Sequence, residues 1–288
     1  MILLSILLGF ILEYFLGSLD RVRNFKWFDS FSDWLDSRLG KYPLWNGPAG
    51  VLATLAIPLL LLYAIVYQAN SLWVVAGFII ATLVFIYSLG SDLNTMLNRY
   101  VEALESGDEG RISGLEQKLE ITQGYASGEA RPAIQALILR AHAHIFAVVF
   151  WFILLGPVGG LLISLAEKIQ RRFDAIHGGY ADAARNLYQI LIWPSTRVLA
   201  VGFALGGSLV DALDGWRRVQ GHPLDTSEEI VSESGIGALQ LGTRVHDTDD
   251  EEQSLYITQI QDAQALLNRT LIIWLTVVGL LTLGGILR

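Results

Sequence analysis

The stretch "PAGVLATLAIPLLLLYAIVYQANSLWVVAGFIIATLVFIYSLG", residues 48–90, decides the fold, because it contains no charged side chain. A helix that crosses a bilayer needs about 20 mostly apolar residues. Residues 48–67 and 72–90 each supply such a run, and only "QANS" separates them. We therefore predict two membrane-spanning helices that form an antiparallel hairpin.

The composition of the whole chain agrees with this prediction. Of its 288 residues, 52% are hydrophobic and only 17% are charged, whereas about a quarter of the residues of a soluble domain are charged. The chain has no cysteine, which excludes disulfides, thiolate metal sites and cysteine nucleophiles. The net charge of -8, with no clustered basic surface, disfavours nucleic acid as a partner.

We predict an all-α, polytopic integral membrane protein with broken or re-entrant helices and amphipathic cytoplasmic helices. It forms one membrane domain over residues 1–288. The first apolar run, "MILLSILLGFILEYFLG", has no preceding lysine or arginine and no A-x-A site, so we expect it to be retained. The apolar segments are 1–17, 48–67, 72–90, 143–166, 187–209 and 270–287, and the helical polar loops are 18–47, 91–141 and 210–268.

The segment 143–166 contains "GPVGG" at 156–160, where proline removes a backbone donor and glycine loosens the helix. This predicts a break or a re-entrant turn. Lysine and arginine concentrate in the loops 18–47 and 167–186, so both loops should be cytoplasmic. Residues 143–166 would then enter the membrane and return; if they span it, "KIQRR" lies outside, against this rule.

Two polar stretches have the pattern of surface helices. "WFDSFSDWLDSRLG", residues 27–40, places its aromatic residues near one helical face and its aspartates near the other. That pattern is typical of a helix that lies on a membrane or in a bundle. Residues 91–122 are also helical in character, with an interruption at "SGDEG".

Arg197 stands inside the apolar segment 187–209, three residues after Pro194. A proline there frees the carbonyl near Ile190, which needs a substitute partner such as Ser195, Thr196 or water. Arginine binds a carboxylate or phosphate through two parallel hydrogen bonds, so a polar, anion-binding pocket is one interpretation. The alternative is that Arg197 snorkels to an interface or pairs with Glu13 within the bundle.

Asp174 and His177 lie close to Arg197 in sequence, within "RRFDAIHGGYADAARN". Spaced three apart, they would share a helical face, which permits proton transfer or metal binding. Two ligands make a weak metal signal, and we predict no metal site. The structural alternative is that Asp174 caps a helix or bridges to Arg171 and Arg172, with "HGGY" as a helix terminus.

The other polar features predict less. His142 and His144 point to different helix faces and are expected to mark a wet entrance to the segment 143–166. The acidic run 247–252, "DTDDEE", could attract magnesium but is typical of a solvated loop. The chain has no P-loop, G-x-S-x-G or H-E-x-x-H motif, so neither a catalytic residue nor a cofactor can be named.

The residues from 142 to 207 resemble the AmpE family of bacterial inner-membrane proteins. The resemblance rests on Phe150 and Trp151, the "GPVGG" break, and Trp193, Pro194 and Arg197. It implies a multi-pass protein of the inner (cytoplasmic) membrane with a sensory or signalling role in β-lactamase induction, and hence antibiotic resistance, and in peptidoglycan recycling.

The chain is similar, more distantly, to CobD/CbiB, a membrane enzyme of cobalamin biosynthesis that uses ATP to form an amide bond. Glu13 in the first apolar segment, Asp174, Gly179 and Tyr180 in "RFDAIHGGY", and the P-x-x-R element carry this similarity. It implies an alternative function, a membrane-embedded ATP-dependent amide ligase or transferase. A transporter with discontinuous helices is a third possibility.

The residues together predict a ligand-binding site on the cytoplasmic side, formed by Glu13, Asp174, His177 and Arg197. The expected partners are the lipid bilayer and an anionic small molecule or nucleotide. The glycines of the last segment, Gly279, Gly284 and Gly285, permit close helix packing and therefore a homodimer.

Overall fold

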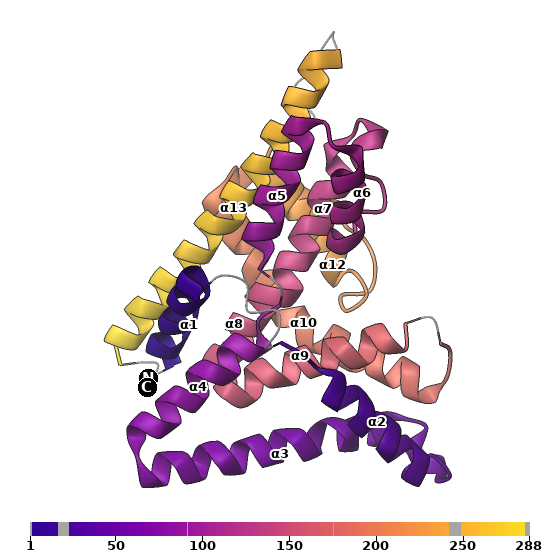
Figure 1. Cartoon of the computed structure of the whole chain (residues 1–288), viewed down its shortest axis with the longest axis vertical. Coiled ribbons are helices and arrows are strands. Elements are labelled where there is room, and N and C mark those ends of the chain that lie inside the picture. The colour runs from indigo at the N-terminus through magenta and orange to yellow at the C-terminus, as the bar shows by residue number, and fades with distance from the viewer. Residues whose placement is uncertain (1, 17–22, 91, 175, 242–248, 286–288) are drawn as a thin grey trace. The chain divides into compact units, whose positions relative to one another are not determined.

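The computed structural model describes residues 2–16, 23–90, 92–174, 176–241 and 249–285 (Figure 1). These residues form helices and turns with no strand among them, which confirms the all-α prediction. By their contacts they divide into two compact units. Unit 1 contains residues from 2–90 and 147–192, and unit 2 contains residues from 92–146 and 193–285.

Five helical stretches are long and apolar enough to cross a membrane, which indicates a multi-pass membrane protein. The first helix, Ile2–Leu16, is apolar but shorter than these. The five stretches are Pro48–Leu72, Val74–Ser106, Ala130–Leu155, Gly179–Gly206 and Gln253–Leu283.

Unit 1 is built around the predicted hairpin, but the turn is displaced from its predicted place. The residues "QANS" at 68–71 belong to the last turn of the first hairpin helix, and the helix breaks instead at Trp73, which has extended backbone angles. The helices of unit 1 are α1 (Ile2–Leu16), α2 (Lys26–Leu39), the short 3-10 helix η1 (Pro43–Trp45), α3 (Pro48–Leu72), α4 (Val74–Ser88), α8 (Ala147–Leu155), α9 (Pro157–Arg172) and the first part of α10 (Gly179–Gly206).

The predicted break at "GPVGG" is confirmed. α8 ends at Leu155, and Gly156 has φ 63° and ψ -150°, a conformation that essentially only glycine adopts. α9 then begins at Pro157, whose missing N–H is not needed at a helix start. A Cβ on Gly160 would lie 3.0 Å from the Phe152 ring, so glycine lets α9 fold back closely against α8.

Unit 2 contains several polar helices and the longest of the described helices, α13 (Asp249–Leu283). Its elements are α5 (Leu93–Ser106), α6 (Glu109–Leu119), η2 (Tyr125–Ser127), α7 (Ala130–Ala141), the π-helical turn η3 (His142–Phe146), the second part of α10, α11 (Leu209–Arg218), α12 (Ser227–Ala238) and α13 (Asp249–Leu283). The predicted interruption at "SGDEG" is confirmed, because α5 ends before Gly107 in the left-handed conformation and Asp108 caps α6.

The C-terminal segment differs from the prediction of an apolar helix over 270–287. α13 begins 21 residues earlier, at Asp249, and ends at Leu283. Gly284 and Gly285 therefore follow the helix, so they do not form a packing face within it, as the sequence prediction assumed. The acidic run divides: residues 249–252 open α13, and residues 247 and 248 lie outside the described residues.

Candidate functional site

Arg197 lies in the middle of α10, and its guanidinium joins that helix to the start of α12 within unit 2. Nη1 donates to Ser227 Oγ at 2.7 Å and to Thr196 Oγ1 at 2.9 Å, and Nη2 donates to the Pro223 carbonyl. The guanidinium carbon also lies 4.9 Å from the centre of the Trp193 ring, a cation–π contact. Hydroxyls, a carbonyl and an aromatic face therefore surround this cation.

Close helix packing holds α12 in place against α11 and α10. A Cβ on Gly215 would lie 2.3 Å from the Glu233 carbonyl oxygen, and a Cβ on Gly237 would lie 2.1 Å from that of Asp211. Only glycine permits backbones to approach this closely. Ser208 N also donates to the Ala238 carbonyl at 3.0 Å, so the C-terminal end of α12 is tied to the residues that follow α10.

The positive charge of Arg197 has no carboxylate partner in the described part of unit 2. No aspartate or glutamate of unit 2 forms an ion pair with it among the described residues. Nη1 and Nη2 bond Ser227 Oγ and Pro223 O, and Nε donates to no acceptor in the described part of unit 2. The half-buried guanidinium can therefore offer its Nε side to an anion.

A second polar contact lies two residues before Arg197. His142 Nε2 and Ser195 Oγ are 2.9 Å apart, and their residues are 2% and 0% exposed. His142 opens the π-helical turn η3, an irregularity that is frequent at functional sites. The prediction that His142 marks a wet entrance is therefore wrong, because its side chain is buried against α10.

Pro194 stands inside α10 without ending it. Trp193 O accepts hydrogen bonds from Thr196 Oγ1 at 2.8 Å and from Arg197 Nη1 at 3.2 Å. Thr196 therefore donates a hydrogen bond to the helix backbone near the proline. Its acceptor is the carbonyl of Trp193, whereas the prediction was the carbonyl near Ile190.

Glu13 has an arginine partner within unit 1. Its Oε1 lies 2.6 Å from Arg23 Nη2, and the two side chains are 16% and 5% exposed. Arg23 also donates to the carbonyls of Ile86 and Gly90, at the end of α4. This pair ties α1 to the C-terminus of α4, where a cation is favourable.

Asp174 and His177 lie between α9 and α10, outside any helix, so they do not share a helical face as predicted. Both residues are exposed. Asp174 Oδ1 accepts from Gln170 Nε2 at 3.1 Å, and its carbonyl accepts from Arg185.

The arginines that were the alternative partners of Asp174 pair elsewhere. Arg171 pairs with Glu167 at 2.9 Å, and Arg172 pairs with Asp33 of α2. Three of the predicted site residues, Glu13, Asp174 and His177, thus belong to unit 1, and Arg197 belongs to unit 2.

Sequence reasoning missed the part of the Arg197 site that α12 supplies. Pro223 and Ser227 lie in the predicted loop 210–268. The pattern Thr226-x-x-Glu229 before an apolar residue could have marked a helix start there. No local pattern could have shown that this start meets Arg197, since the residues are 26 and 30 positions apart.

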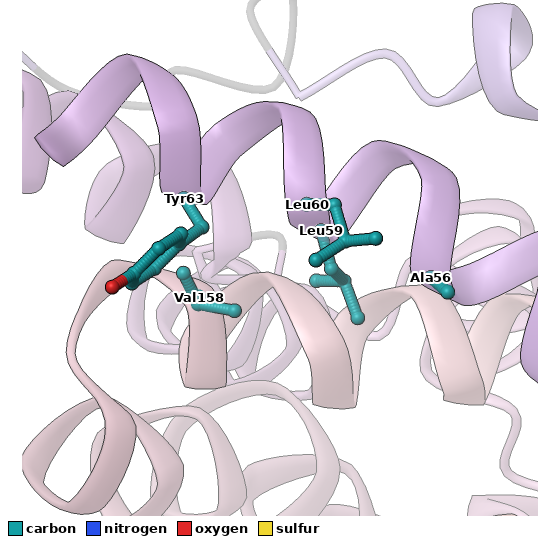
Figure 2. Close-up of a pocket in the computed structure, with 5 residues that line it drawn as sticks. All are labelled: Ala56, Leu59, Leu60, Tyr63 and Val158. Carbon is teal, nitrogen blue, oxygen red and sulfur yellow. The ribbon is translucent and has the colours of Figure 1, made fainter. Parts of the chain in front are cut away.

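The apolar pocket in Figure 2 lies between α3 and α9 of unit 1. Leu59, Leu60, Ala56 and Val158 line it with the ring of Tyr63. Such a lining suits a hydrocarbon chain and offers no cation to an anionic ligand. In the described residues, no three His, Asp or Glu side chains are grouped to hold a metal ion.

Comparison with protein-family models, with curated proteins and with solved structures gave no match to this chain.

Proposed function

We propose that this chain is an AmpE-like protein of the bacterial inner membrane, with a sensory or signalling role in β-lactamase induction and peptidoglycan recycling. Its site binds an anionic small molecule at Arg197. The observation that carries the proposal is the Arg197 guanidinium in a candidate membrane helix, held by Ser227, Thr196 and Pro223 with no carboxylate partner in the described part of unit 2. A charge at that depth costs about 2.5–3.5 kcal/mol on insertion scales, so its retention calls for a function.

The two sequence elements of the AmpE resemblance support the assignment through a contact within unit 1. Trp151 Nε1 donates to the Leu191 carbonyl at 3.0 Å, across 40 residues. Leu191 lies two residues before Trp193, at the start of the "WPSTR" element. Trp151 of α8 is therefore hydrogen-bonded to the part of α10 that belongs to unit 1.

The chemistry of the site favours a carboxylate or phosphate ligand. A guanidinium whose terminal nitrogens are fixed by Ser227 and Pro223 has lost much of its rotational freedom before a ligand arrives. Peptidoglycan fragments carry several carboxylates and are the anions that the AmpE resemblance implies.

The test uses purified protein and soluble anionic peptidoglycan fragments, with binding measured by calorimetry. Arg197→Gln should abolish binding, and Arg197→Lys should weaken it about tenfold or more, because lysine lacks the planar fork. Arg269→Gln is the matched control, since Arg269 also lies in a long apolar helix but, among the described residues, bonds only Ala265 O of its own helix. In cells, Arg197→Gln should lower β-lactamase induction while the protein still inserts.

Equal binding and equal induction by the wild type and Arg197→Gln would refute the proposal. ATP-dependent turnover by the purified protein, lost in Arg197→Gln, would replace it with the ligase function that the CobD/CbiB similarity implies.

A further inference from the structure

α2 has three distinct faces, and one of them is an exposed aromatic stripe. Phe28, Ser32 and Leu35 are buried in unit 1. On another face, Trp27 and Trp34 remain 44% and 55% exposed, although they lie in a folded helix. Phe31 continues this stripe, and its ring stacks on that of Trp34 with the centres 6.4 Å apart.

The stripe continues beyond the end of α2. Tyr42 is 62% exposed and Leu44 is 80% exposed. Trp45, in contrast, is buried and donates through Nε1 to Asp36 at 3.0 Å, which ties η1 to α2. We define the aromatic stripe as Trp27, Phe31, Trp34, Tyr42 and Leu44.

The acidic face of α2 is turned to protein partners. Asp33 pairs with Arg172 of α9, and Asp29 Oδ1 lies 3.9 Å from Nη1 of the same arginine. Asp36 accepts from Trp45. The acidic groups of this amphipathic helix are thus all engaged away from the stripe.

The cations next to the stripe are free of such pairs. Arg38 lies 6.0 Å from the centre of the Trp34 ring, and Lys41 follows the helix. Both side chains are exposed, and neither forms an ion pair with a described residue. Apolar aromatic rings flanked by unpaired cations are complementary to a bilayer surface that carries negative charge.

The chain also holds α2 at the membrane boundary. α3, a candidate span, begins at Pro48, only nine residues after α2 ends at Leu39. At the other end of the stripe, Trp27 Nε1 donates at 2.6 Å to the hydroxyl of Tyr87, in the last turn of α4. The start of α3 and the end of α4 therefore fix the depth of α2 relative to the bilayer.

We propose that α2 and η1 form an interfacial site for anionic phospholipids. The aromatic stripe inserts at the level of the glycerol and upper acyl groups, where tryptophan and tyrosine concentrate in membrane proteins. Arg38 and Lys41 bind the phosphates and negative headgroups above it. This inference does not depend on the proposed function of Arg197.

The absence of cysteine makes a spin-label test direct, since each introduced cysteine is unique. Labels at Trp34→Cys and Leu44→Cys are compared in vesicles of phosphatidylcholine alone and of phosphatidylcholine mixed with phosphatidylglycerol. Power saturation with oxygen and with a nickel chelate measures depth. Leu60→Cys, on the exposed side of α3, gives the lipid reference, and Ser113→Cys, on exposed α6, gives the water reference.

Labels at residues 34 and 44 should lie at a depth between the two references. The fraction of these labels that is docked in the membrane surface should be larger when phosphatidylglycerol is present. Arg38→Gln and Lys41→Gln should each lower the docked-to-undocked ratio about fivefold in the mixed vesicles. Lys118→Gln, on α6, should leave it unchanged. Three results would overturn the proposal: labels as accessible to nickel as Ser113→Cys, labels shielded from both reagents by a protein partner, or docking that is independent of phosphatidylglycerol.

Discussion

Glu13 stabilises the fold through Arg23, and replacing it should cost far more than replacing an exposed carboxylate. Two charges 2.6 Å apart attract by about 6 kcal/mol at an effective dielectric constant of 20. Desolvation offsets part of this energy, and removing one partner of a buried pair costs about 3–5 kcal/mol. Glu13→Gln keeps an acceptor oxygen, so we expect a loss of about 3 kcal/mol in the free energy of unfolding.

The assay is equilibrium unfolding of the purified protein in mixed micelles, followed by circular dichroism. Arg23→Gln should cost more than Glu13→Gln, because it also removes the donors to the carbonyls of Ile86 and Gly90. Asp214→Asn is the control. Its pair with Arg217 is exposed and 3.7 Å long, so its loss should stay below about 1 kcal/mol.

The loss in the free energy of unfolding should therefore be largest for Arg23→Gln, smaller for Glu13→Gln and smallest for Asp214→Asn. If Glu13→Gln and Asp214→Asn lower stability equally, the Glu13–Arg23 pair does not hold α1 to α4. If Glu13→Gln instead leaves stability intact and abolishes ligand binding, Glu13 belongs to the ligand site as the sequence predicted.

Three further predictions concern unit 2. Ser195→Ala should destabilise the protein by about 1–3 kcal/mol, because it leaves the buried His142 ring without its hydroxyl partner, and His142→Ala should add little more in the double variant; strictly additive losses in a double-mutant cycle would contradict this. Gly237→Ala should destabilise by about 1–3 kcal/mol, since its Cβ would meet a carbonyl oxygen of α11 at 2.1 Å, and unfolding as stable as that of the wild type would show that the helices are not in backbone contact. Hydrogen bonds from Ser208 and Gln240 hold the pKa of Asp211 below its usual value, so its contribution to stability is present above about pH 4 and is lost as the pH falls through the lowered pKa; Asp211→Asn should flatten this acid limb of the stability curve, and an unchanged limb would assign it to other groups.

Hydropathy predicted the membrane helices well where a long run is free of charge, as in Pro48–Leu72, whereas Gly179–Gly206 stood out less because it carries Asp182, Arg185 and Arg197. It placed their ends poorly where a helix continues beyond the apolar run. α13 extends back to Asp249 because Tyr256, Ile260, Ala263 and Leu267 recur at helical spacing and are buried in unit 2. That periodicity is visible in the sequence, but a search for uninterrupted apolar runs passes over it.

The candidate site was predictable only in part, because Arg197 and its acceptors Pro223 and Ser227 are 26 and 30 residues apart in the sequence. Arg197 could be singled out, because an arginine inside an apolar run is costly. Its acceptors at Ser227 and Pro223, in and just before α12, could not, since packing of α12 against α11 through glycines places them there. Glu13 was assigned to the ligand site, whereas it pairs with Arg23, only ten residues further along the chain.

The most direct test of the central claim is a structure of the purified protein at a resolution that reveals a molecule bound at Arg197. The account predicts density for a non-lipid anion, with an oxygen within hydrogen-bonding distance of Arg197 Nε and with Ser227 and Pro223 still bound to the terminal nitrogens. A protein carboxylate or a lipid phosphate in that position would contradict it, because Arg197 would then be neutralised without a soluble ligand.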